Sequence, residues 1–220
     1  MKKYTLLLLF IFATAATSNG APPTGQLHVG WAMTSITPDQ PVALAGQFHK
    51  RISERVESPC TATVLALETR KGDQSLEQAI MVSCDLVLIA DTLQPRLRKM
   101  LAGRLPGFDP KKLFLNATHT HTGPVTRAIG WYTIDDKNVM KPPAYVDFML
   151  KKIAAAIEAA WKNRAPGGVS WGLGHAVVGS NRRMVYRTAQ GTPPFGGGTA
   201  AMYGRNNIPD FLSVEGSEDT

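Results

Sequence analysis

Two histidines, His119 and His121, are the residues of this sequence whose types and spacing best suit chemistry. In an extended chain, side chains at i and i+2 leave the same face, with their Cα atoms ~6.5–7 Å apart. Imidazole is the commonest metal ligand and also an acid or base near neutral pH. The pair could share one metal, or one ring could bind a metal while the other handles protons. The alternative is a polar loop with two solvated histidines.

A short strand is expected to carry this pair to the edge of a sheet. Residues 112–116, KLFLN, have the aliphatic and aromatic content of a strand, and Gly123-Pro124 stops any regular structure soon afterwards. The histidines should therefore sit where a strand ends, which is a common place for functional residues.

Asp85 ends a second, nearly all-apolar strand at residues 79–86. Its composition predicts a central strand that is covered on both faces. Residues 91–105 have leucines at helical spacing, so the order strand, helix, strand predicts a βαβ crossover. Ligand sites in such sheets gather at the carboxyl ends of strands. Asp85 is then either a cap or turn former or a polar member of the histidine pocket.

The other segments complete the expected fold class, which is α/β with a mixed sheet flanked by helices. The turn at Lys71-Gly72-Asp73 should join residues 61–68 and 79–86 as a hairpin or as neighbours in one sheet. From Thr188 onward, glycine and proline predict loops. The sequence reads as that of a protein cut short. Further strands are expected at residues 26–32 and 169–178, the latter with His175 as a structural or surface histidine, and a second helix is expected at residues 145–163.

Composition and charge narrow the function classes. The 220 residues, 44% hydrophobic and 19% charged, suit one globular domain. The net charge of +7 comes from scattered residues, and the densest group, at 96–104, has the helical spacing of a solvated face, so nucleic acid is not an expected partner. A mildly basic exported protein could contact an anionic membrane surface. Cys60 and Cys84 would fit one disulfide, although their spacing does not require it.

Residues 1–21 have the layout of a secretory signal peptide. Lys2 and Lys3 precede an apolar run at about residues 5–16, and small residues follow up to Ala21. The apolar run is too short to span a bilayer. We expect removal near residues 18–21 and export of residues 22–220 to the periplasm or the medium.

Four motifs together resemble the N-terminal part of the catalytic domain of neutral (alkaline, non-lysosomal) ceramidases. The resemblance covers residues 27–220, and its most specific part is the run THTHTGP at 118–124. The other motifs are Gly30-Trp31-Ala32 followed by Ile36-Thr37-Pro38, then Ser83-Cys84-Asp85-Leu86, and Ser180-Asn181-Arg182-Arg183.

The resemblance implies a zinc-dependent amide hydrolase that converts N-acylsphingosine to sphingosine and a fatty acid. His119 would be a zinc ligand, His121 a catalytic residue facing the substrate, and Arg182 a catalytic residue that holds the substrate or stabilises the oxyanion. Zinc activates water and polarises a carbonyl, while imidazole and guanidinium stabilise negative charge on oxygen.

The family's remaining zinc ligands, a histidine, a glutamate and a tyrosine, are expected beyond Thr220. A catalytic zinc site normally has three protein ligands plus water, so whether these residues alone form an enzyme is left open. The substrate would be a lipid amide or another small amide. The alternatives are a non-catalytic exported fragment or binding protein, and a metallo-hydrolase of another bond that arranges His119, His121 and Asp85 around a metal.

Overall fold

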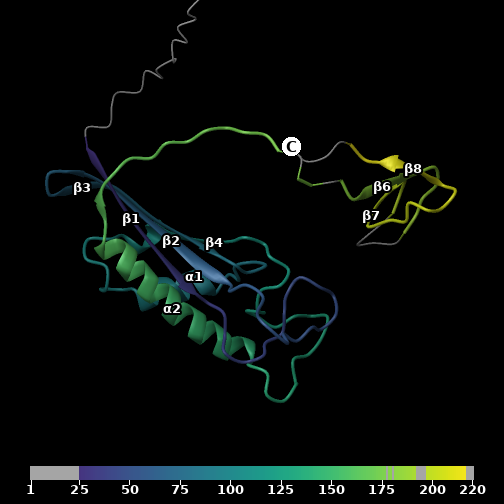
Figure 1. Ribbon diagram of the computed structural model, residues 1–220, viewed down its shortest axis with the longest axis horizontal. Coiled ribbons are helices and arrows are strands. Elements are labelled where there is room, and N and C mark those ends of the chain that lie inside the picture. The colour runs from purple at the N-terminus through teal and green to yellow at the C-terminus, as the bar shows by residue number, and fades with distance from the viewer. Residues whose placement is uncertain (1–24, 177, 180, 192–196, 217–220) are drawn as a thin grey trace, which may run out of the picture. The chain divides into compact units, whose positions relative to one another are not determined.

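A computed structural model describes residues 25–176, 178–179, 181–191 and 197–216 (Figure 1). The chain divides into two compact units, Met1–Gly168 and Val169–Thr220. The predicted signal peptide at residues 1–21 lies outside the described residues.

A five-stranded sheet in the order β4-β3-β2-β1-β5 forms the centre of the first unit (Figure 1). β3 and β4 are parallel, and the other neighbours are antiparallel. The hairpin between β2 and β3 turns at Gly72, whose φ of 59° favours glycine. This mixed sheet confirms the predicted fold class. The strands are β1 Gln26–Ser35, β2 Thr61–Lys71, β3 Gln74–Cys84, β4 Leu113–Ala117 and β5 Ala165–Pro166.

Two helices, α1 Leu93–Met100 and α2 Pro142–Lys162, cover the same face of this sheet (Figure 1). α1 joins β3 to β4 as the predicted crossover, but it is shorter than expected because turns replace the helix after Met100. A short 3₁₀ helix, η1 Pro110–Lys112, leads into β4. No helix within the described ranges is long and apolar enough to cross a membrane. Fully buried apolar side chains of both layers form the core, among them Val64, Ile80, Val82, Leu97, Met149, Leu150, Ile153 and Ile157.

Two contacts fix α2 against the sheet. A Cβ atom at Gly30 of β1 would lie 2.0 Å from the carbonyl oxygen of Ala160, so only glycine lets the helix approach this closely. Near the end of α2, the Arg164 guanidinium pairs with Glu68 of β2, with Nη2 2.9 Å from Oε2. Glu68 is 3% exposed, and its carboxylate needs this partner.

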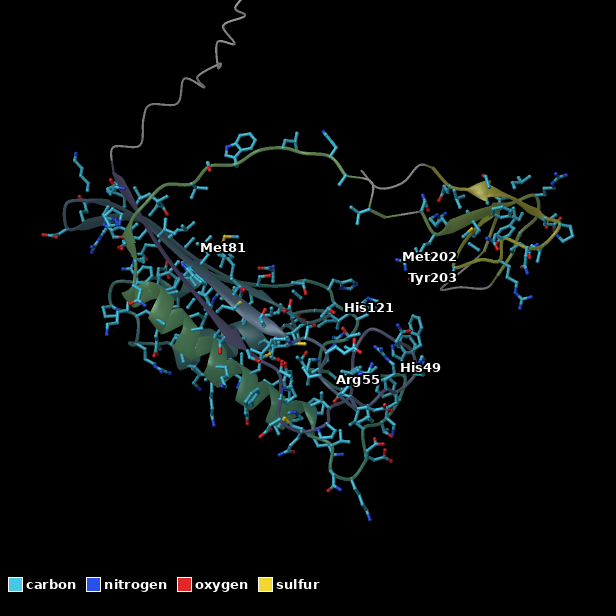
Figure 2. All side chains as sticks on the ribbon, viewed as in Figure 1. His49, Arg55, Met81, His121, Met202 and Tyr203 are labelled. Carbon is cyan, nitrogen blue, oxygen red and sulfur yellow. The ribbon has the colours of Figure 1, made fainter. Side chains whose placement is uncertain are left out.

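The opposite face of the sheet is open among the described residues. β3 is an inner strand as predicted, but Met81 is 48% exposed and lies on the side away from α2 (Figure 2). The prediction that β3 is covered on both faces is therefore wrong within the first unit taken by itself. Strand pairing aligns Met81 with Trp31, Leu65 and Phe114 in one apolar row across four strands.

The second unit contains a three-stranded antiparallel sheet in the order β7-β6-β8. Tyr186 is buried there, and its hydroxyl donates to the carbonyl of Arg205 at 2.8 Å. The expected strand at 169–178 is not formed by its described residues, and His175 is exposed. Two of the three strands follow Thr188, where only loops were expected. They are β7 Ala200–Met202 and β8 Phe211–Val214, and the third strand is β6 Arg183–Tyr186.

Candidate active site

His119 and His121 lie just beyond β4, and their rings meet. Their Nε2 atoms are 3.3 Å apart, and the ring centroids are 5.0 Å apart at an interplanar angle of 74°. Both side chains are exposed. Figure 2 shows His121 on the loops beyond the end of the sheet. The two histidines therefore share one site, at the carboxyl ends of the parallel strands β3 and β4.

The backbone conformation that brings the two rings together is not the extended strand that was expected. His119 has a φ of 64°, in the left-handed region that is uncommon for residues other than glycine. This local turn rotates the chain between the two histidines. Left-handed residues outside glycine cost free energy and concentrate at functional sites.

A hydrogen bond fixes the His119 ring. Its Nδ1 donates to the main-chain carbonyl of Val87 at 2.6 Å. A carbonyl oxygen can only accept, so the proton must be on Nδ1. In the neutral ring, Nε2 then carries the lone pair that faces His121. Metal-binding histidines are commonly oriented by such a bond from their other nitrogen.

The pair fits a tetrahedral metal on geometric grounds. Two nitrogens, each ~2.0–2.1 Å from a zinc ion, would be roughly 3.3–3.4 Å apart in a tetrahedral arrangement, and the observed separation is 3.3 Å. Within the described ranges, however, no group of three or more His, Cys, Asp or Glu side chains is placed to hold a metal. The chain thus presents two nitrogen donors, fewer than a complete zinc site uses.

The loop of residues 42–46 supports the histidine turn from one side. The amide of Ala45 donates to the carbonyl of Gly123 at 2.9 Å, and Leu44 forms an isolated bridge with Pro124. A Cβ atom at Gly46 would lie 2.5 Å from Cβ of His121, and Gly46 has a φ of 94°. The close packing of this loop against His121 therefore requires glycine at position 46.

Asp85 is a structural clamp and not a member of the histidine pocket. Its Oδ2 accepts from both the amide and the hydroxyl of Thr61, each at 2.8 Å, and its Oδ1 accepts from the Thr118 hydroxyl at 3.2 Å. It therefore joins the ends of β2, β3 and β4. The alternative arrangement, with His119, His121 and Asp85 around one metal, is therefore not present, because these three residues do not make a metal-binding group.

Replacing Asp85 by alanine should destabilise the first unit without changing metal binding. The change would leave the part-buried Thr61 amide without its acceptor, and bonds to a carboxylate are strong, so we expect a loss of about 2–3 kcal/mol of unfolding free energy. Asp85→Asn keeps one acceptor oxygen and should lose about half as much. Urea unfolding measures both. A wild-type midpoint for Asp85→Ala would contradict the clamp.

The two cysteines next to this clamp are free and poor nucleophiles. Cys84 is buried and Cys60 half-buried, and no disulfide joins them. Burial, with a smaller contribution from the charge of Asp85, raises the pKa of the Cys84 thiol to about 12. The same two causes raise the pKa of Cys60. Because the thiolate is the reactive form, neither cysteine is suited to covalent catalysis.

A cavity of about 810 Å³ lies on the other side of the histidine turn. Thr120 and Thr122, which alternate with the histidines, line it together with Asp85 and parts of residues 37–60. The histidines themselves do not line it. It is therefore a separate hollow behind the turn and not the space into which the imidazoles point.

Arg182, the third predicted site residue, lies in the second unit just before β6. Its side chain is exposed, with the guanidinium carbon 4.9 Å from the ring centroid of Tyr203. Asn181 shapes this turn, since its Oδ1 accepts from the amide of Arg183 at 2.9 Å. The catalytic role of Arg182 stays a prediction from the resemblance.

Sequence reasoning missed the residues that hold the histidine pair. Val87 contributes only a main-chain oxygen, which side-chain identity does not reveal. Gly46 is far from the motif in sequence. A signal was present for Gly46, because glycine between a buried run and a charged segment often marks a special backbone conformation.

Comparison with solved structures identifies the class of fold. The chain is similar to neutral ceramidase from Pseudomonas aeruginosa, with 17% identity and a TM-score of 0.52 over 75% of this chain and 24% of that chain. It is also similar to a ceramidase complexed with C2, with 18% identity and a TM-score of 0.52 over 74% of this chain and 23% of that chain. No protein-family model and no curated protein sequence matches the chain.

The predicted resemblance to neutral ceramidases is thus confirmed at the level of the fold. At this identity the likeness establishes the architecture alone. The chain spans about a quarter of the length of these structures.

Proposed function

We propose that this chain is part of a zinc-dependent amide hydrolase that acts on lipid amides of the N-acylsphingosine type. The observation that carries the proposal is the fixed His119 ring, whose Nδ1 bond to Val87 leaves Nε2 facing His121 at 3.3 Å. The ceramidase-like fold supports the choice of an amide as the bond that is cleaved. The whole enzyme would take further zinc ligands from outside these residues.

Each histidine has a distinct task in this proposal. His119 would hold zinc through Nε2, because its other nitrogen is committed to the Val87 carbonyl. His121 would hold a proton at Nε2 and pass it to or from the substrate. When bound, zinc polarises the amide carbonyl and lowers the pKa of a bound water. Arg182 is proposed from the resemblance as a substrate-holding cation, and export after signal removal belongs to the same proposal.

The test uses the whole enzyme, in which this chain is joined to the residues that supply the further zinc ligands, stripped of metal with a chelator. Zinc is added back, its stoichiometry is measured by atomic emission, and cleavage of a fluorescent N-acylsphingosine is followed beside a fluorescent phosphodiester. One bound zinc per chain, with amide cleavage that is lost on chelation and restored by zinc, supports the proposal. Absence of zinc binding, or cleavage of the phosphodiester alone, overturns it.

A further inference from the structure

The side chain of Arg51 reaches from the 42–53 segment to the histidine turn. Its Nη2 donates both to the carbonyl of Ala45, at 2.8 Å, and to the carbonyl of His121. One nitrogen thus joins two separate stretches of chain. The His121 carbonyl belongs to the residue that carries the imidazole, so this bond restrains the part of the turn that carries the ring.

The backbone of Arg51 is itself fixed. The amide of Leu44 donates to the Arg51 carbonyl at 2.9 Å, and the neighbouring Ile52 forms a bridge with Ala43. The guanidinium therefore extends from a strand-like pair into a defined place. A long side chain that starts from a fixed backbone loses less freedom when it forms its bonds, and arginine is preorganised by its planar group.

The placement is poorly suited to stability alone. Nε of Arg51 is buried and has no hydrogen-bond partner among the described residues. No carboxylate in the described ranges lies within ion-pair distance of its guanidinium. A part-buried charge that is incompletely paired costs free energy, and such costs gather at functional sites.

We propose that Arg51 is a positioning residue for His121, which its guanidinium holds by the main-chain carbonyl so that Nε2 of His121 faces Nε2 of His119. The catalytic consequence rests on the proposed function, whereas the placement of the ring does not. His119 is held separately, by Val87. Loss of Arg51 should therefore displace the His121 ring and leave the bond from His119 Nδ1 to Val87 intact.

The experiment compares Arg51→Met and Arg51→Lys with a matched control, Arg55→Met. Arg55 lies four residues along the same segment, and its exposed side chain pairs with Glu57 (Figure 2). The ring ¹⁵N resonances of both histidines are recorded by NMR in the metal-free proteins, and circular dichroism establishes that each variant is folded. Arg51→Met should shift and broaden the His121 signals and leave the Nδ1 signal of His119, which is bonded to Val87, in place. Arg51→Lys should give an intermediate result because it keeps one donor, and Arg55→Met should match the wild type.

Two results would overturn the inference. One is an unchanged His121 spectrum in a folded Arg51→Met protein. The other is a disturbance of the Nδ1 signal of His119 as large as that of the His121 signals, which would indicate general loosening. If Arg51→Met fails to fold, Arg51→Lys is judged by the same two criteria.

Turnover separates this inference from the proposed function. Where the chain cleaves the amide, Arg51→Met should lower kcat by about 10- to 100-fold with KM within about twofold, since misplacing a catalytic group by ~1 Å can cost that much. If the wild type is inactive but Arg51→Met changes the His121 signals selectively, the proposed hydrolase function is refuted and the positioning role of Arg51 stands. If the wild type is active but Arg51→Met leaves the His121 signals unchanged, the positioning role is refuted and the hydrolase function stands.

Discussion

Replacing His119 by alanine is expected to abolish zinc binding and amide cleavage together. The change removes Nε2 of His119, the ring nitrogen that is oriented for metal binding because Nδ1 of the same ring is bonded to the Val87 carbonyl. Loss of a group that only hydrogen-bonds a metal ligand typically lowers metal affinity by about 10- to 100-fold. Loss of the ligand itself should therefore weaken zinc binding by at least about 100-fold. Competition with a chromophoric chelator measures the affinity, and a fluorescent N-acylsphingosine measures the rate.

His121→Ala should behave differently, because the proposal gives this ring a proton and not the metal. Zinc affinity should stay within a fewfold of wild type, while kcat falls by about 10²- to 10⁴-fold, the usual contribution of a general acid or base. His175→Ala serves as the matched control, since His175 is exposed in the second unit. Equal loss of zinc in both motif variants would show instead that the two imidazoles bind one metal together, as their 3.3 Å separation allows.

Gly30→Ala is expected to cause the largest loss of stability among single methyl additions to the first unit. The new Cβ would lie 2.0 Å from the carbonyl oxygen of Ala160, which belongs to the backbone of α2 and cannot rotate away. Either the helix must shift along the sheet or the strand must bend. Overpacking of this kind typically costs about 1–3 kcal/mol, and we expect the upper end, about 3 kcal/mol, from urea unfolding.

Gly130→Ala is the control for this substitution. No heavy atom lies within 4 Å of the position that its Cβ would take, and its φ is not in the left-handed region. Its stability should stay within about 0.5 kcal/mol of wild type. If both variants lose the same amount, the cost comes from the backbone freedom of glycine and not from contact with the helix.

Local patterns in the sequence were sufficient for the elements with strong periodicity. The helix expected at residues 145–163 and the turn at Gly72 both depend on residues close in sequence. The strand expected at residues 169–178 was a wrong prediction. A strand also needs a partner strand, and none pairs with the described residues of this segment. β7 and β8 were missed for the opposite reason. They are short, follow glycine-rich residues, and are strands only because each pairs with β6.

The closeness of the two histidines could be predicted from the sequence, but the contacts that support them could not. The spacing of His119 and His121 correctly indicated that their side chains would meet, although the left-handed backbone of His119 has no signature in a histidine. Asp85 lies near the motif as expected, yet its carboxylate oxygens accept hydrogen bonds from the hydroxyls of Thr61 and Thr118. A carboxylate at a strand end looks the same in a sequence whether it binds a metal or holds two strands together.

The contacts that build the histidine turn also bear on the order of folding. β1, β2 and β3 pair with their neighbours in the chain, so this meander closes only the turn at residues 72–73 and the segment at residues 36–60. The contacts of Ala45 with Gly123 and of Arg51 with His121 instead close a loop of roughly 70–80 residues, which costs more chain entropy. Such distant pairings generally form late. In a refolding experiment, sheet structure should therefore appear before the histidine pair is assembled, and a nascent chain would carry a folded scaffold for a time before it carries a site.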